Sequence, residues 1–200
     1  MSEVSFTVNG QPYRIRVEPR SLLSDALREQ CGLPGTHVGC EHGVCGSCTI
    51  LDGGQPVRSC LMLAVQADGR EFTTVEGLGT PGELSPLQQA FRAEHGLQCG
   101  FCTPGILLTL KAHLAGHPEA SEAELRDVLS GSLCRCTGYQ NIVAAALRAA
   151  GHPAAELPAA SGENAEAGPE SPLGAAVARR EDARLLTGTA TFTDDLTVPG

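Results

Sequence analysis

The sequence predicts an α+β fold in which a strand-rich region precedes a helix-rich region. Apolar and polar residues alternate over the first 75 or so positions, whereas residues 84–150 carry helix caps and apolar residues at helical spacing. Eight of the nine cysteines also fall into two sets of four, one set in each region. The 200 residues therefore suggest two small domains, for which we expect bounds of 1–78 and 84–150.

Strands are expected in the first region wherever apolar side chains alternate with polar ones. Alternation covers residues 4–8, an Asn-Gly turn follows, and a second alternating run covers residues 13–17. Apolar residues at helical spacing predict a short helix over 22–30. Further strands are expected over 48–51, 57–63 and 72–75. A mixed sheet with one helix across it is typical of a β-grasp, plant-type ferredoxin-like domain.

Four helices are expected in the second region. Ser85 and Ser121 each have a glutamine or glutamate three residues later, which is the pattern of a capping box. Thr103 precedes a proline in the same way that Ser85 does, so we expect it to cap a third helix. A fourth helix is expected over 141–149. These elements predict a four-helix bundle.

The first cysteine set has the spacing C-x4-C-x2-C-x11-C, which is typical of a plant-type [2Fe–2S] cluster. Three sulfurs must reach one small cluster from nine residues of backbone, so the loop must turn sharply. Glycines at 39, 43 and 46 can supply the positive φ angles that such turns need. A wrapped loop also directs backbone N–H groups at the sulfurs. The predicted ligands are Cys40, Cys45, Cys48 and Cys60.

The second cysteine set has the spacing C-x2-C-x31-C-x-C, and each of its two pairs precedes a predicted helix. Helix N-termini carry unpaired N–H groups and a partial positive charge, which favour an anionic cluster. The predicted ligands are Cys99, Cys102, Cys134 and Cys136. Two [2Fe–2S] clusters within about 150 residues predict a path for single electrons.

Disulfides and zinc are the alternatives for these cysteines. The first residues lack the basic and apolar segments of a signal peptide, which favours a reducing, cytoplasmic location and metal over disulfides. Zinc fits paired C-x2-C knuckles, and the second set has only one such pair. Cys31 has no partner spacing, and we interpret it as a small buried or half-buried residue.

Charge and hydropathy exclude two classes of partner. The net charge is −9, so a basic surface for nucleic acid is not expected. No segment approaches the roughly 18 consecutive apolar residues that a membrane-spanning helix needs.

The last 50 residues change character. Residues 151–171 are rich in alanine, proline, glycine and glutamate and lack lysine and arginine, which indicates a flexible linker. Residues 172–200 regain signals of ordered structure, which are a cluster of basic and acidic residues, the stretch 183–186, and an expected short strand over 191–193. This segment has too little apolar mass to fold alone, so it must dock on something or continue into something.

The cysteine motifs resemble one family closely. The stretches Gly-Cys-Glu-His-Gly-Val-Cys-Gly-Ser-Cys from 39, Gln-Cys-Gly-Phe-Cys-Thr-Pro-Gly from 98 and Cys-Arg-Cys-Thr-Gly-Tyr-Gln-Asn from 134 are similar to the small iron–sulfur subunit of molybdenum hydroxylases. These are the xanthine dehydrogenase, aldehyde oxidoreductase and carbon monoxide dehydrogenase relatives. The resemblance covers about residues 3–150 and looks closest to the bacterial carbon monoxide dehydrogenase-like group.

The resemblance implies an electron-transfer module of a molybdenum-dependent oxidoreductase, without a substrate-binding catalytic centre of its own. It implies that the second cluster lies nearer a molybdopterin cofactor on a large subunit and that the first lies nearer FAD on a medium subunit. Gln98 matches the family glutamine that contacts the pterin, and Cys136 matches the cluster ligand nearest to it. A dimer of heterotrimers is a plausible assembly. The substrate, whether carbon monoxide, an aldehyde, a purine or another heterocycle, would be selected by the large subunit.

Residues 172–200 resemble the start of the molybdopterin-binding large subunit, which implies a fusion of the small and large subunits through the 151–171 linker. The alternative is an arm that wraps a separate large subunit. Two other functions remain open at this point. They are a free-standing two-cluster carrier or redox sensor, and a zinc-bound interaction module.

Overall fold

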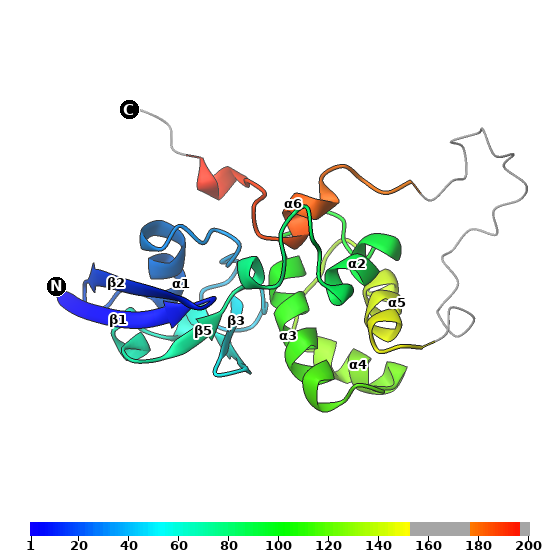
Figure 1. The fold of residues 1–200 in the computed structure, drawn as a ribbon, viewed down its shortest axis with the longest axis horizontal. Coiled ribbons are helices and arrows are strands. Elements are labelled where there is room, and N and C mark those ends of the chain that lie inside the picture. Colours follow the sequence, from blue (N-terminus) through cyan, green and yellow to red (C-terminus); the bar gives the residue numbers. More distant parts are fainter. Residues whose placement is uncertain (153–176, 197–200) are drawn as a thin grey trace, which may run out of the picture.

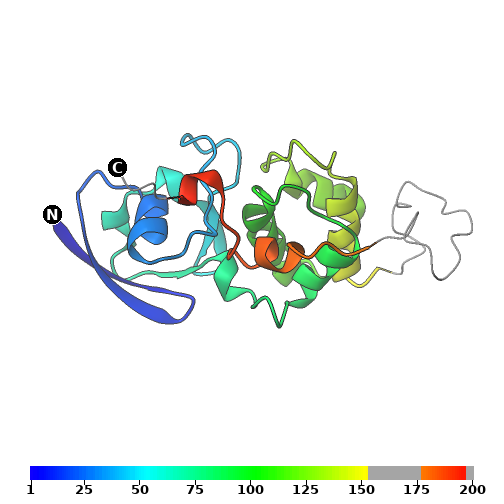
Figure 2. The same ribbon diagram turned by 90° about the horizontal axis from the view of Figure 1, so that it is seen from above.

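The computed structural model describes residues 1–152 and 177–196 and contains a strand-rich unit beside a helix-rich unit. Figure 1 shows the two units side by side, with α3 of the helical unit next to the sheet. The segment 177–196 runs from the helical unit back to the strand-rich unit, and Figure 2 shows the same path from above. No helix within the described residues is long and apolar enough to cross a membrane.

The first unit is built on a five-stranded mixed sheet of order β2-β1-β5-β3-β4. Strand β1 (Ser2–Val8) pairs antiparallel with β2 (Gln11–Val17) and parallel with β5 (Glu71–Thr73). Strand β3 (Thr49–Asp52) pairs antiparallel with both β5 and β4 (Gln55–Arg58). The mixed sheet that the alternating pattern predicts is therefore confirmed.

Burial follows the alternation in sequence. Val4, Phe6 and Val8 of β1 are buried, and the turn residue Asn9 has the positive φ of 52° that a tight hairpin turn requires. The predicted helix over 22–30 is present as α1 (Leu23–Asp25), continued by the wider π-type turn η1 (Ala26–Gln30). Its apolar residues share one core with the sheet.

Two predicted strands are partly wrong. The strand expected over 57–63 ends at Arg58, and the chain continues as the 3₁₀ turns η2 (Ser59–Leu61) and η3 (Ala64–Ala67). Ser59 still donates its N–H to the carbonyl of Cys48 at 3.2 Å, in register with the pairing of β3 and β4, and its hydroxyl bonds to the same oxygen at 2.8 Å. The strand ends there because the N–H of Met62 donates a 3.3 Å hydrogen bond to the carbonyl of Ser59 and closes a 3₁₀ turn. The strand expected over 72–75 likewise ends at Thr73 and gives way to η4 (Val75–Gly77).

The second unit contains four helices around one apolar core. They are α2 (Pro86–Ala93), α3 (Thr103–Gly116), α4 (Glu122–Leu129) and α5 (Gln140–Ala149). The capping boxes predicted at Ser85 and Ser121 are both present. The cap predicted at Thr103 is wrong, because Cys102 is the N-cap of α3 and Thr103 is its first helical residue.

The segment 177–196 contains α6 (Asp182–Leu186) and the 3₁₀ turn η6 (Thr193–Asp195). The strand expected over 191–193 is wrong. The carboxylate of Asp195 accepts a hydrogen bond of 2.7 Å from the N–H of Phe192, which bends the backbone into a turn. The linker expected over 151–171 lies outside the described residues except for its first two positions.

Candidate metal centres

The first cysteine set gathers between the sheet and the helical unit. Cys48 directly precedes β3, and Cys60 lies in η2. Both are buried, whereas Cys40 and Cys45 on the preceding loop are half-buried. The four predicted ligands are therefore brought together from one loop and one turn, with one pair deeper than the other.

The glycines of this loop have two different roles. Gly43 and Gly46 have φ angles of 79° and 80°, as the sharp turns require. Gly39 is not in the positive-φ region, so the positive φ expected at this position is wrong, whereas Glu41 has a φ of 55°. A Cβ at position 39 would lie 3.3 Å from the sulfur of Cys45. Gly39 therefore provides space beside a predicted ligand.

Backbone N–H groups point at the sulfurs, as the wrapped loop predicts. The N–H of Cys45 lies 3.4 Å from the sulfur of Cys40. Hydrogen bonds from the backbone of Cys45 and His42 lower the pKa of the Cys40 thiol to about 6. Burial, reinforced by the neighbouring Cys48 thiol, instead raises the pKa of Cys60 to about 12. Cys40 therefore ionises to a thiolate readily, whereas the buried Cys60 would need a bound cation to stabilise its thiolate.

The second cysteine set lies at the loops before α3 and α5. Cys102 caps α3, and Cys134 lies on the loop that leads to α5. Burial raises the pKa of Cys102. Burial also acts to raise the pKa of Cys134, but hydrogen bonds from Thr137 outweigh it and hold that pKa below its ordinary value. The expected position at a helix N-terminus therefore applies to Cys102, whereas Cys134 and Cys136 lie in the turns before α5.

Tyr139 organises this second loop. It has a φ of 67°, which is uncommon for a residue other than glycine, and it is the N-cap of α5. Its hydroxyl accepts a hydrogen bond of 2.8 Å from the N–H of Cys134 and donates one of 2.8 Å to the carbonyl of Ser132. The ring thereby fixes the backbone that carries a predicted ligand.

Within each set the thiols form two pairs. The sulfurs of Cys99 and Cys136 lie 3.5 Å apart. The side chains of the other pairs also influence one another, and these pairs are Cys102 with Cys134, Cys48 with Cys60, and Cys40 with Cys45.

This pairing bears on the kind of metal group. A [2Fe–2S] cluster takes two thiolates on each of its two irons, so its ligands fall into pairs. A structural zinc ion would need four ligands around one point. The donor sets therefore fit a two-iron group better than zinc.

Cys31 stands apart from both sets, as its lack of partner spacing predicts. It is half-buried and packs against the apolar core of the sheet unit. Burial raises the pKa of its thiol to about 11, so it remains a neutral, unreactive thiol at neutral pH.

The two cysteine sets face each other across the contact between the units. The N–H of Leu133, directly before Cys134, donates a 2.8 Å hydrogen bond to the carbonyl of Cys45. A Cβ at Gly105 in the first turn of α3 would lie only 2.2 Å from the carbonyl oxygen of Gly46. Two glycines therefore allow α3 to approach the first cysteine loop closely.

Gln98 and the outer pair of the second set lie on the surface. Gln98, Cys99 and Cys136 are all exposed, in contrast to the half-buried Cys102. The carbonyl of Gln98 accepts a 2.6 Å hydrogen bond from Arg179, and its side chain stays on the exposed side. This edge of the helical unit is therefore open to another domain or subunit.

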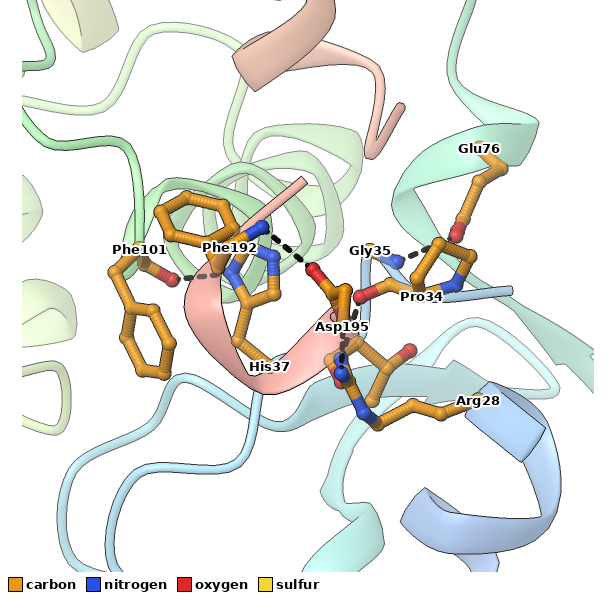
Figure 3. A network of polar contacts seen from close by, with 9 residues as sticks. Arg28, Pro34, Gly35, His37, Glu76, Phe101, Phe192 and Asp195 are labelled. Carbon is orange, nitrogen blue, oxygen red and sulfur yellow. Dashed lines mark hydrogen bonds and ion pairs between the residues drawn. The ribbon is translucent and has the colours of Figure 1, made fainter. Parts of the chain in front are cut away.

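One cluster of side chains at this junction was not predicted from the sequence. Figure 3 shows His37, Phe101 and Phe192 gathered beside an ion pair between Arg28 and Asp195. The five residues come from three distant parts of the chain and follow no local pattern. The available signal was that Phe101 lies between two predicted ligands and that His37 lies three positions before Cys40.

Comparison with known proteins agrees with this geometry. A family model described as a 2Fe-2S iron-sulfur cluster binding domain matches residues 6–75, and one described as a [2Fe-2S] binding domain matches residues 74–147. The gamma subunit of caffeine dehydrogenase from Pseudomonas sp. strain CBB1 is 59% identical over 143 residues, which cover 70% of this chain and 86% of the relative.

Two solved structures are similar to this chain, and they cover different fractions of it. Quinoline 2-oxidoreductase from Pseudomonas putida 86 matches with a TM-score of 0.73 and 56% identity, over 74% of this chain and 92% of its own. Aldehyde oxidoreductase from Desulfovibrio gigas matches with a TM-score of 0.84 and 36% identity, over 98% of this chain but only 22% of its own. The second match therefore extends into residues beyond the two cysteine-bearing units.

Proposed function

Because the chain belongs to the electron-transfer iron–sulfur subunits of molybdenum hydroxylases, we propose that its two cysteine sets hold two [2Fe–2S] clusters in series. The observation that carries the proposal is the hydrogen bond between Leu133 and Cys45, since it joins the two cysteine loops directly. When bound, such clusters accept and release single electrons. The first site would use Cys40, Cys45, Cys48 and Cys60, and the second would use Cys99, Cys102, Cys134 and Cys136.

The division of the chain into domains follows the two cysteine sets and their separate apolar cores. We propose a β-grasp domain over 1–78, a four-helix bundle over 84–150, a linker over 151–171 and a docking segment over 172–200. The separate apolar cores of the sheet and the helices support the first division. Leu185 and Leu186 belong to the helical core, which supports docking of the last segment on this chain.

The direction of transfer is also a proposal. Gln98 and Cys136 are exposed on the same unit, which supports a contact between this edge and the molybdopterin of a large subunit or domain. The second cysteine set would then receive electrons first and the first set would receive them next. The half-buried Cys40 and Cys45 would face FAD on a medium subunit. The residues of this chain hold and shield the clusters and do not bind the substrate.

The chain is thus one part of a multi-subunit oxidoreductase. We propose a large and a medium subunit as its partners, a cytoplasmic location and a dimer of such heterotrimers. The match of D. gigas aldehyde oxidoreductase over 98% of this chain supports the fusion of residues 172–200 to a large subunit. A reading frame that closes directly after Gly200 would contradict the fusion and favour an arm on a separate large subunit.

Metal analysis and electron paramagnetic resonance (EPR) of anaerobically purified protein test the two sites. We expect about four irons per chain and two distinct EPR signals on reduction. Cys45→Ser should remove one signal and leave the other, and Cys102→Ser should do the reverse. Cys31→Ser is the matched control, because Cys31 lies outside both sets, and it should keep both signals. Zinc in place of iron in the unmodified protein would overturn the proposal.

A further inference from the structure

The segment 177–196 crosses from one cysteine-bearing unit to the other. Its first half is anchored to the helices, since the buried side chain of Gln88 donates a 2.8 Å hydrogen bond to the carbonyl of Leu186. It then passes Gly35 of the sheet unit, where a Cβ would lie 2.7 Å from the Cα of Gly188. The crossing point therefore has room for backbone only.

The second half of the segment is anchored to the sheet unit. Asp195 forms an ion pair with Arg28, and the two side chains are only 12% and 18% exposed. A second nitrogen of Arg28 donates hydrogen bonds of 2.6 and 3.0 Å to the carbonyls of Pro34 and Thr36. Arg28 thus connects the end of the segment 177–196 to residues 34–36, which directly precede the first cysteine loop.

Between these anchors lies a direct contact of the two cysteine loops. His37 donates a 2.7 Å hydrogen bond from Nδ1 to the carbonyl of Phe101, and the two rings stack at 4.8 Å with an interplanar angle of 19°. Phe101 lies between Cys99 and Cys102, and a Cβ at Gly39 would lie 3.4 Å from its ring. A shift of either side chain would therefore move a loop that carries predicted ligands.

Phe192 covers this contact. Its ring meets His37 at 4.7 Å and Phe101 at 5.5 Å, both in edge-to-face geometry, as Figure 3 shows. His37 is only 3% exposed as a result. A hydrogen bond that water cannot reach is stronger than an exposed one, so Phe192 stabilises the contact that it covers.

We propose that residues 177–196 act as a clamp, in which Phe192 and Asp195 hold His37 against Phe101 and so fix the separation of the two cysteine sets. Phe192 and Asp195 are positioning residues in this view, because neither touches a predicted ligand. The consequence for electron transfer rests on the proposed two-cluster function, whereas the clamp itself can be measured without it.

The test compares three variants of the full-length protein. Asp195→Asn removes the charge that Arg28 binds, and Phe192→Ala removes the covering ring. Asp194→Asn is the matched control, since Asp194 is exposed and loses the same charge one position earlier. Iron content and the visible spectrum report cluster loading. Amide hydrogen exchange at residues 36–40 and 99–102, together with the magnetic interaction between the two reduced centres in EPR, reports the clamp.

We expect exchange at both segments to rise about tenfold in Asp195→Asn and Phe192→Ala, a factor that corresponds to about 1.4 kcal/mol. In both variants the EPR splitting caused by the magnetic interaction between the two centres should become smaller or less well defined, while the iron content stays unchanged. Asp194→Asn should match the unmodified protein in all of these measurements. If Phe192→Ala does not load iron, Phe192→Leu replaces it, with the same expectation in weaker form. Unchanged exchange and unchanged coupling in loaded Asp195→Asn and Phe192 variants would overturn the clamp. Absence of iron from the unmodified protein would overturn the proposed function instead, and the exchange data would still decide the clamp.

Discussion

Replacement of Gly105 by alanine should separate the two units, because at this glycine α3 lies directly against the backbone of the first cysteine loop. The added Cβ would lie 2.2 Å from the carbonyl oxygen of Gly46 and 3.1 Å from that of Ser47. Ordinary contact begins at 3.4 Å, so the helix and the loop must move apart by about 1.2 Å. Both obstacles are backbone atoms, which no side-chain rotation can remove.

The magnitude follows from two opposing effects. Overpacking of this kind costs about 1–3 kcal/mol, and a clash with backbone belongs at the upper end of that range. Alanine is favoured over glycine by about 1 kcal/mol in a helix interior, and this is an upper bound for Gly105 in the first turn of α3. We therefore expect Gly105→Ala to lower the free energy of unfolding by about 2 kcal/mol, which is a fall of roughly 4–8 °C in the melting temperature.

The control is the same substitution in the same helix. Gly116 lies at the end of α3, and a Cβ there would meet no atom within 4 Å. Gly116→Ala should therefore leave the melting temperature unchanged or raise it. Thermal unfolding of both variants at one scan rate, with iron content measured alongside, gives the comparison. Equal melting temperatures for Gly105→Ala and Gly116→Ala would refute the close-contact argument.

Four further predictions concern single contacts. Tyr139→Phe removes the hydrogen bond from Cys134 and should cost about 1–3 kcal/mol, with a changed EPR signal of the helical site only. Ser121→Ala removes a helix cap and should cost about 1 kcal/mol without loss of iron. Burial lowers the pKa of His37 from 6.5, so its protonation should weaken the folded state as the pH falls below that value. Asp195 is partly buried, which opposes ionisation, but the Phe192 N–H and Arg28 outweigh this and hold its pKa below 3.8. The ionised Asp195 should therefore stabilise the fold fully above pH 3.8, and this stabilisation should disappear at lower pH. Denaturant unfolding measured from below pH 3.8 to above pH 6.5 checks the effects of both His37 and Asp195.

Local chemistry predicted the regular elements well. Alternation located β1 because one face of that strand is buried, and the Ser121 capping box located α4 because both of its hydrogen bonds are made within four residues. Apolar spacing located α5 to within one residue of its start, since its inward residues are all buried. These signals succeed where the neighbours in sequence are also the neighbours in space.

The prediction failed where distant residues decide the local structure. After Arg58 the chain turns instead of continuing the strand, and the hydroxyl of Ser59 bonds to the carbonyl of Cys48, 11 positions earlier. The cap expected at Thr103 lies at Cys102, since α3 starts at Thr103, one residue earlier than a cap at Thr103 would allow. The contact between His37 and Phe101 joins residues 64 positions apart, and no spacing rule in a single sequence relates them. The cysteine spacings remained visible because, apart from Cys60, each predicted ligand lies on the same short loop as another one.

The return of the last segment to the start of the chain also sets an order of events during synthesis on the ribosome. Arg28 and Asp195 are separated by 167 positions, so their pairing must wait until nearly the whole described chain has been translated. All eight cysteines of the two sets have been synthesised once Cys136 is made, and Cys136 precedes Asp195 by 59 residues. At typical translation rates this interval lasts about 3–12 s. Assembly factors thus meet both thiol quartets while the covering segment has yet to emerge.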